Sequence, residues 1–168
     1  IAVAVYSPTF NAQWGYDDYP VIVHNPDIRS IDAFLKDSYP GRPLREVTYM
    51  LDYKFFGDEP TGYHIQNILW HVIAAILIWV LMAELRRPNV EGAIAALLFL
   101  VHPLAVEVVA NVSHRKDSLM LVFSLLSTWF FVKAMRGNKL LFLPTLVCGI
   151  LAYFSKQSAV ALPLVFSG

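Results

Sequence analysis

The feature that most constrains the fold is a series of apolar runs that occupies the chain from residue 65 onward. Polar turns such as RRPNVE, SHRKD and RGNK separate these runs, which cover residues 65–85, 92–112, 118–135 and 140–154, with the start of another at 159. The runs are apolar on all sides, whereas an amphipathic surface helix shows a polar face at the 3.6-residue period. Because four such helices cannot all hide in the core of a small soluble domain, the sequence predicts an all-α integral membrane protein with about four transmembrane helices.

Composition supports this class of protein. The chain is 57% hydrophobic and 15% charged, with a mean hydropathy of +0.51, so it is more apolar and less charged than ordinary soluble domains. A straight spanning helix needs about 20 apolar residues, and the third and fourth runs are short for that role. Lys plus Arg and Asp plus Glu number 13 each, and no basic stripe with interleaved aromatics occurs, so no nucleic-acid partner is expected.

The residues before these runs are more polar. Residues 11–64 hold most of the Asp and Tyr, with turn signals at HNPD, SYPGRP and GDEPTG, and we expect them to form a hydrophilic loop segment. Residues 1–10 resemble the tail of a first transmembrane helix. Since the chain opens with Ile1 rather than Met, we expect it to be truncated at both ends.

The basic residues of the short loops predict the orientation in the membrane. Arg86 and Arg87 follow the first run, and Lys133, Arg136 and Lys139 lie between the third and fourth. Lys and Arg favour the cytoplasmic side of short loops, which makes these two loops cytoplasmic and places residues 11–64 and 102–117 on the extracytoplasmic side.

A second group of ionisable residues lies on that extracytoplasmic side. Arg115 and Lys116 oppose the loop-charge rule there, and a functional cluster that also includes Asp117 would explain their placement. His102 and Glu107 interrupt an otherwise membrane-compatible run, where ionisable residues are costly and usually face a cavity or a partner. Pro103 should break or kink the helix, since proline removes a backbone donor. The alternative is a helix that ends at Val101 and an ordinary wet loop over 103–116.

Two adjacent carboxylates, Asp17 and Asp18, stand in QWGYDDYPVIVHNPDI. Adjacent side chains of an extended segment point to opposite sides, so one carboxylate can face a reacting group while the other binds a cation or anchors the backbone. The alternative is a pair that makes local turn bonds before Pro20.

Five motifs in register carry a family resemblance over residues 5–164. They are YDDYPVIVHNPDI, GRPLREVTYMLDYKFFG, GYHIQNILWH, LLFLVHPLAVEVVANVSHRKDSL and SKQSAVALPL. In this order they resemble the N-terminal half of the membrane O-mannosyltransferases that carry C-terminal tetratricopeptide repeats, and of their prokaryotic relatives. The resemblance implies a partial C-type glycosyltransferase fold.

The resemblance also implies a reaction. The donor would be a polyprenyl- or dolichyl-phosphate sugar, mannose-like, and the acceptor a Ser or Thr hydroxyl of a translocated protein. Asp17 or Asp18 would be the general base, with Asp17 preferred, and such a base contributes roughly 10²–10⁴-fold in rate. Attack opposite the lipid phosphate would invert the anomeric centre.

Other residues of the motifs acquire expected roles. Cations stabilise the charge that develops on a departing phosphate, and the candidates for this role are Arg42, Arg115, Lys116 and Lys156. Each could instead be an interfacial anchor. Supporting roles fall to His64, His102, Glu107 and Asp117. Asp18, His102 and Glu107 could hold a divalent metal, although their spacing is not diagnostic.

The sequence departs from the family pattern in length. No tetratricopeptide period follows, and the chain stops where the family continues through further spans. A second hypothesis therefore stands beside the transferase: a non-catalytic accessory subunit, derived from such an enzyme, that packs against membrane lipids and other membrane subunits.

Overall fold

The computed structural model describes residues 1–37 and 42–162, and within these ranges the chain is helical and forms no strand. The α-helices are α1 (Ala2–Tyr6), α2 (Ile31–Asp37), α3 (Pro43–Phe56), α4 (Pro60–Glu84), α5 (Asn89–Val101), α6 (Pro103–Ala110), α7 (Arg115–Met135) and α8 (Phe142–Ser155). Short 3-10 or π turns connect them: η1 (Ser7–Asn11), η2 (Tyr19–Val23), η3 (Val112–His114), η4 (Lys139–Leu141) and η5 (Gln157–Ala161). The all-helical class is as the sequence predicts.

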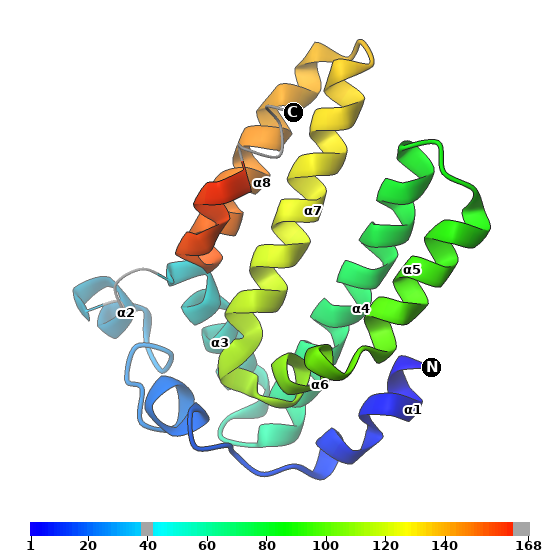
Figure 1. The fold of residues 1–168 in the computed structure, drawn as a ribbon. Helices are drawn as coiled ribbons and strands as arrows, with labels where there is room; N and C mark the ends of the chain where they lie inside the picture. Colours follow the sequence, from blue (N-terminus) through cyan, green and yellow to red (C-terminus); the bar gives the residue numbers. More distant parts are fainter. Residues whose placement is uncertain (38–41, 163–168) are drawn as a thin grey trace.

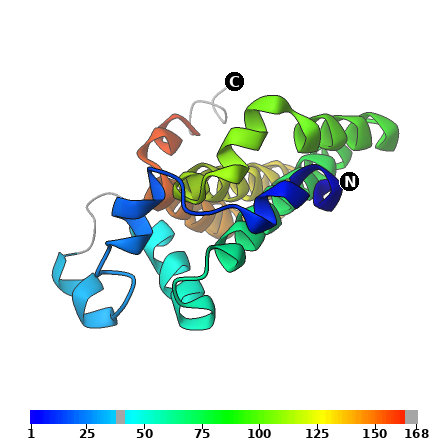
Figure 2. The same cartoon turned by 90° about the horizontal axis from the view of Figure 1, so that it is seen from below.

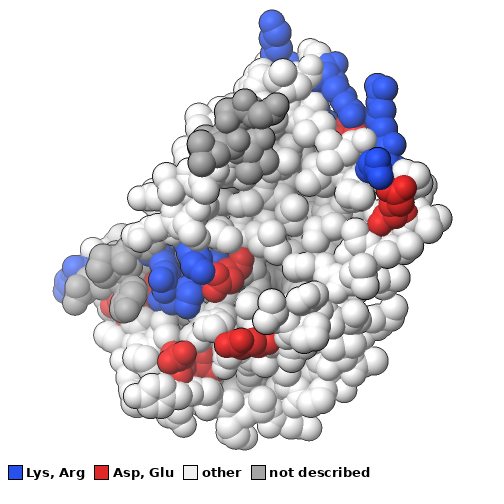
Figure 3. Space-filling model, in the orientation of Figure 1, with Lys and Arg blue, Asp and Glu red and all other residues white. Residues whose placement is uncertain are grey.

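The four longer apolar helices lie side by side (Figure 1). Helix α4 packs against α5 and α7, and α7 packs against α8. The α4–α5 and α7–α8 turns share one end of the molecule, where Figure 3 shows Lys and Arg gathered. There the Glu84 carboxylate accepts a hydrogen bond from Arg136 at 2.5 Å and lies 3.9 Å from the Lys133 ammonium. We call this end of the molecule the basic end. The two loops that the sequence predicts on one side of the membrane, one after α4 and one between α7 and α8, both lie there.

The opposite end carries the polar first part of the chain. Seen from below, the segment that starts with α1 crosses the ends of the long helices, and α2 and α3 lie to one side of them (Figure 2). Helix α1 is attached by Tyr6, whose hydroxyl lies 3.1 Å from His71 Nε2 of α4 and donates to the Leu100 carbonyl of α5 at 3.0 Å. Residues 11–64 were expected to form a loop segment. In the structure they contain η2, α2, α3 and the first turn of α4.

The number of candidate membrane spans is smaller than the four that the sequence predicts. Within the described residues, Pro60–Glu84 and Val112–Met135 are long and apolar enough to cross a membrane, and α5 with α6 makes a third if that bent pair is one span. Helix α8 has 14 residues and falls short of the length that a straight span requires. Only 28% of the most apolar window of each long span is buried, so most of its apolar surface faces outward, as expected beside lipid.

Proline and glycine account for the helix boundaries. Pro43 and Pro60 stand in the first turns of α3 and α4, where a missing N–H costs nothing, and Gly57 ends α3 at φ 60°. His102 is extended at ψ 129° before Pro103, and α5 and α6 meet at a 57° bend. The predicted break at Pro103 is confirmed.

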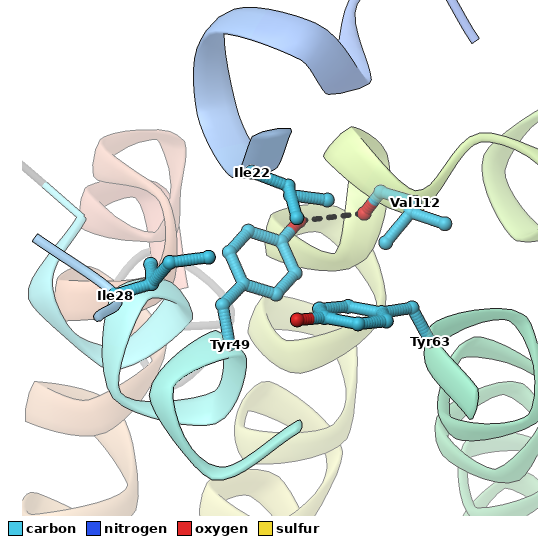
Figure 4. Close-up of a cluster of buried hydrophobic side chains, with 5 residues drawn as sticks. All are labelled: Ile22, Ile28, Tyr49, Tyr63 and Val112. Atoms are coloured by element: carbon cyan, nitrogen blue, oxygen red, sulfur yellow. Dashed lines mark hydrogen bonds between the residues drawn. The ribbon is translucent and has the colours of Figure 1, made fainter. Parts of the chain in front are cut away.

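A buried cluster joins the first part of the chain to the long helices (Figure 4). Ile22 and Ile28 pack with Tyr49 of α3, Tyr63 of α4 and Val112 of η3. The Tyr49 hydroxyl donates to the Val112 carbonyl at 2.6 Å, which satisfies the polar end of a buried aromatic ring. The cluster fixes the segment that carries the acid pair.

Candidate functional site

The two adjacent aspartates have different environments. Asp17 is exposed, whereas the Asp18 side chain is 1% exposed. Asp18 Oδ2 accepts the Gly15 N–H at 2.8 Å, and its Oδ1 accepts the Ser113 N–H at 2.7 Å. Asp18 therefore anchors the backbone, and Asp17 is the carboxylate that an incoming molecule can reach.

Ser113 connects this acid pair to the basic residues of α7. Its N–H donates to Asp18, while its carbonyl accepts a hydrogen bond from the Lys116 ammonium at 3.4 Å. The Lys116 side chain and the carboxylate pair thus lie on either side of one residue, although Asp18 and Lys116 are far apart in sequence.

Three of the predicted phosphate ligands gather where α3, α7 and α8 meet. The positive charges of Arg42 and Lys156 both lie close enough to act on the Lys116 ammonium. Lys156 pairs with Asp117, which α7 presents in its first turn. Figure 3 shows a group of Lys and Arg beside an acidic side chain in this region. We call Arg42, Lys116 and Lys156 the cation cluster.

Arg115, the fourth predicted phosphate ligand, is in a different environment. Its side chain is fully buried and forms an ion pair with Asp52 of α3. It also donates to Asn67 Oδ1 at 2.8 Å and to the Tyr63 carbonyl at 3.0 Å. These bonds tie α3, α4 and α7 together, so the geometry gives Arg115 a positioning role beside the cation cluster.

Helix α3 contributes a second buried ion pair. Arg45 and Glu46 are 1% and 0% exposed, and the Glu46 carboxylate accepts bonds from Arg45 Nε at 3.0 Å and from Asn25 Nδ2 at 2.8 Å. Burial raises the pKa of the Glu46 carboxyl, and the charge and hydrogen bond of Arg45 oppose that rise. Burial likewise raises the pKa of Asp52, which the Arg115 guanidinium opposes. Helix α3 is therefore held by two buried ion pairs, Arg45 with Glu46 and Asp52 with Arg115.

The predicted supporting histidines occupy separate positions. His64 is buried near the Asp18 carboxylate and the Ala12 carbonyl, and its ring nitrogens form no hydrogen bond of good geometry within residues 1–37 and 42–162. His102 is exposed, and its Nδ1 accepts the Leu104 N–H at 3.2 Å, which makes it the N-cap of α6.

The predicted metal ligands do not come together. Glu107 lies exposed on α6 and Asp18 is committed to two backbone donors. In the part of the chain that the structure describes, no three His, Cys, Asp or Glu side chains are grouped as a metal site would require. The residues present thus do not fit a divalent metal shared by Asp18, His102 and Glu107.

Sequence reasoning missed several residues that hold the site in place. Asp52, Asn67 and Ser113 are all buried, and each bonds to a residue that the sequence singled out. Asp52 and Asn67 stand within the motifs GRPLREVTYMLDYKFFG and GYHIQNILWH. Both are polar residues among mainly apolar neighbours in the sequence, and this pattern could have indicated buried hydrogen-bonding roles.

The assembled arrangement can perform one kind of chemistry. An exposed carboxylate can accept a proton, and neighbouring cations can stabilise an anionic leaving group. Both lie at the end of the molecule opposite the basic end, at the boundary of helices long enough to cross a membrane. A site of this composition is suited to transferring a group from an anionic donor held at a membrane.

Comparisons with known proteins agree with this class. A model of the family described as dolichyl-phosphate-mannose-protein mannosyltransferase matches residues 43–167. The protein O-mannosyl-transferase Tmtc1 of Drosophila melanogaster is 30% identical over 180 residues, covering 95% of this chain and 20% of that protein. Human TMTC4 is 29% identical over 167 residues, with 82% and 22% covered. The tmtc2 protein of Xenopus laevis is 30% identical over 157 residues, with 83% and 19% covered.

The chain belongs to the dolichyl-phosphate-mannose-protein mannosyltransferase family. It is distantly homologous to the Tmtc protein O-mannosyl-transferases over most of its length, as the motifs indicate. It spans about a fifth of the length of these relatives. No solved structure matches the chain.

Proposed function

We propose that the protein carrying this chain transfers a mannosyl group from a dolichyl- or polyprenyl-phosphate donor to a Ser or Thr hydroxyl of an acceptor protein, on the extracytoplasmic side. One observation carries the proposal. The Ser113 backbone is bonded to the buried aspartate of the acid pair and to a lysine of the cation cluster. The proposal is supported by this proximity of the carboxylate pair to a lysine in a member of this family.

Asp17 is the general base of the proposed reaction. As the acceptor oxygen forms its bond to the anomeric carbon, its proton passes to the Asp17 carboxylate, and the bond from that carbon to the phosphate oxygen breaks. The bonding electrons leave with the lipid phosphate. Attack and departure on opposite sides invert the anomeric centre.

The cation cluster stabilises the departing phosphate. Arg42 can bind two phosphate oxygens at once, whereas Lys116 and Lys156 act as point charges. Asp117 holds Lys156 in place until the donor arrives. Direct phosphate binding by Arg115 stays a prediction, and it would require Asp52 to release the guanidinium.

Mannosyl transfer by the purified full-length protein tests the proposal. With dolichyl-phosphate mannose and a Ser/Thr-rich acceptor peptide, Asp17→Asn is expected to lower kcat by about 10²–10⁴-fold and to leave the donor KM nearly unchanged. Asp32→Asn, an exposed aspartate of α2, is the matched control and is expected to retain wild-type kcat.

Two results would contradict the proposal. Full activity of Asp17→Asn would remove Asp17 from the reaction. A folded wild-type protein without transfer, co-purifying with other membrane subunits, would favour the non-catalytic accessory subunit instead.

A further inference from the structure

An open apolar groove of about 700 Å³ runs between α7, α8 and η5. Its walls include Phe131, Phe142, Leu146, Ile150, Phe154 and Val160. Three hydroxyl-bearing residues also border it: Ser127, Thr145 and Tyr153. Ser127 Oγ donates to the Thr145 carbonyl at 2.8 Å, and Thr145 Oγ1 donates to the Leu141 carbonyl at 2.8 Å. Because these two hydroxyl protons are bonded to main-chain carbonyls and most of the other lining side chains are apolar, the groove presents a mainly apolar surface.

One end of the groove adjoins the cation cluster. Phe154 and Ala159 border the groove, and Lys156 stands between them in the chain, with its carbonyl accepting the Ala159 N–H at 3.0 Å. Lys156 pairs with Asp117 at the start of α7. The groove thus begins beside the positive charges of Arg42, Lys116 and Lys156 and extends toward the basic end.

The length of the groove follows from the helix that forms its wall. Phe142 and Phe154 both border it, and at a rise of 1.5 Å per residue the stretch between them measures roughly 18 Å. The neighbouring wall, α7, belongs to a candidate membrane span. The groove therefore lies in the part of the molecule that a membrane would surround if α7 spans it.

Positive charge at one end and an apolar wall along the rest match an amphiphile with an anionic head and a long hydrocarbon tail. We propose that the groove of α7, α8 and η5 holds the isoprenoid chain of the donor lipid while the cation cluster binds its phosphate. This assignment rests on the proposed function, which supplies the polyprenyl-phosphate donor. It adds the position of the donor's isoprenoid chain. It also makes the length of that isoprenoid chain a determinant of donor specificity.

Photo-crosslinking of the full-length protein tests the groove without any need for transfer. The probe is a long-chain polyprenyl phosphate that carries a diazirine within its chain, presented in neutral phospholipid vesicles. Crosslinks are expected on α7, α8 and η5. Ile150→Trp, which fills the groove at a residue 45% exposed, is expected to remove most of them. Val147→Trp on the same helix, 46% exposed and outside the groove, is the matched control and should leave them intact.

Transfer kinetics provide the second measurement. Ile150→Trp is expected to raise the KM of the long-chain donor roughly ten-fold, since displacing even two methylenes has an effect of this size. The KM of a mannosyl phosphate with a one-isoprene chain should rise much less, and the control Val147→Trp should leave kcat and both KM values unchanged.

The outcomes separate the groove from the reaction. Crosslinks in the groove without transfer would support the binding site and contradict the proposed function. Transfer with crosslinks elsewhere, or with crosslinks that Ile150→Trp leaves unaltered, would overturn the groove assignment and leave the reaction standing. Displacement of the probe by phosphatidic acid as effective as by unlabelled polyprenyl phosphate would identify a general phospholipid site and overturn it too.

Discussion

At the scale of single residues, the acid pair shows how neighbours of identical chemistry take different roles. Asp18 is held by two backbone N–H donors, one local and one from η3, whereas Asp17 is exposed. A buried carboxylate that organises a loop and an exposed one that can accept a proton are both needed for a base at a defined position. The pair thus combines an anchor with a carboxylate that is free to meet an incoming molecule.

This difference predicts unequal effects on stability. Asp18→Ala removes a charged acceptor from two backbone donors and is expected to lower the free energy of unfolding by about 1.5–3 kcal/mol. Asp17→Ala, at an exposed site, should change it by no more than about 0.5 kcal/mol. Chemical denaturation of the detergent-solubilised protein measures both. Equal effects of the two substitutions would contradict the anchoring role of Asp18.

The sequence predicted that one carboxylate of the pair would anchor the backbone, but not which one or by what geometry. Alternation along an extended segment was the stated reason, whereas the backbone at Asp18 is helical, at φ −79° and ψ −28°. The partner that selects Asp18 is the Ser113 N–H, 95 residues away. A contact between residues so far apart produces no recognisable pattern in a single sequence. The structure was therefore needed to identify Ser113 as the partner.

At the scale of helices, α3 is fastened to α4 and α7 through buried polar groups. Arg115 and Asp52 are 0% and 4% exposed at their side chains, and Thr48 and Asn67 lie within hydrogen-bond reach of the same guanidinium. The Arg115 guanidinium carbon also lies 4.7 Å from the centre of the Tyr49 ring. Removal of one partner would leave a buried charge without its ion pair.

Breaking the α3–α7 ion pair is expected to be costly. Asp52→Ala should lower the free energy of unfolding by about 3–5 kcal/mol, because Arg115 loses its counter-ion within the protein. Asp58→Ala removes the exposed partner of Arg29 and should cost less than about 1 kcal/mol. Both are measured by denaturation in detergent. The double variant Asp52→Ala with Arg115→Met should recover part of the loss, and no recovery would contradict the ion-pair explanation.

Helix boundaries were more predictable than helix partners. The break at Pro103 follows from the missing N–H of proline, and the turn at Arg86 and Arg87 follows from the interrupted apolar run. The burial of Arg115 was not predictable, because its partner Asp52 lies 63 residues away. A sequence shows that a charge is unusual in its surroundings, but not which distant residue compensates it.

At the scale of the whole molecule, the helices separate two different ends. One end holds the acid pair and the cation cluster, and the other holds the helix turns with Arg86, Arg87 and the Glu84 ion pairs. The sequence predicted the membrane class and this separation from apolar runs and loop charges. Within the described residues, two helices are long and apolar enough to cross a membrane, or three if α5 and α6 form one bent span. Helix α8, which corresponds to the predicted fourth span, has 14 residues and is short for a straight span.

The claim that Asp17 and the cation cluster face the same, extracytoplasmic side is tested most directly by sided cysteine labelling. In a cysteine-free background that includes Cys148→Ala, three single substitutions report the two ends. They are Tyr16→Cys beside the acid pair, Gln157→Cys beside Lys156, and Leu140→Cys in the turn at the basic end, all at exposed residues. The full-length protein is labelled in sealed membranes of known orientation with an impermeant maleimide.

Tyr16→Cys and Gln157→Cys are expected to react from the extracytoplasmic side, while Leu140→Cys reacts there only after the membrane is permeabilised. Labelling of Tyr16→Cys and Gln157→Cys from opposite sides would separate the base from the phosphate site and contradict the proposed reaction. Labelling of all three from one side would show that the helices between them do not cross the membrane.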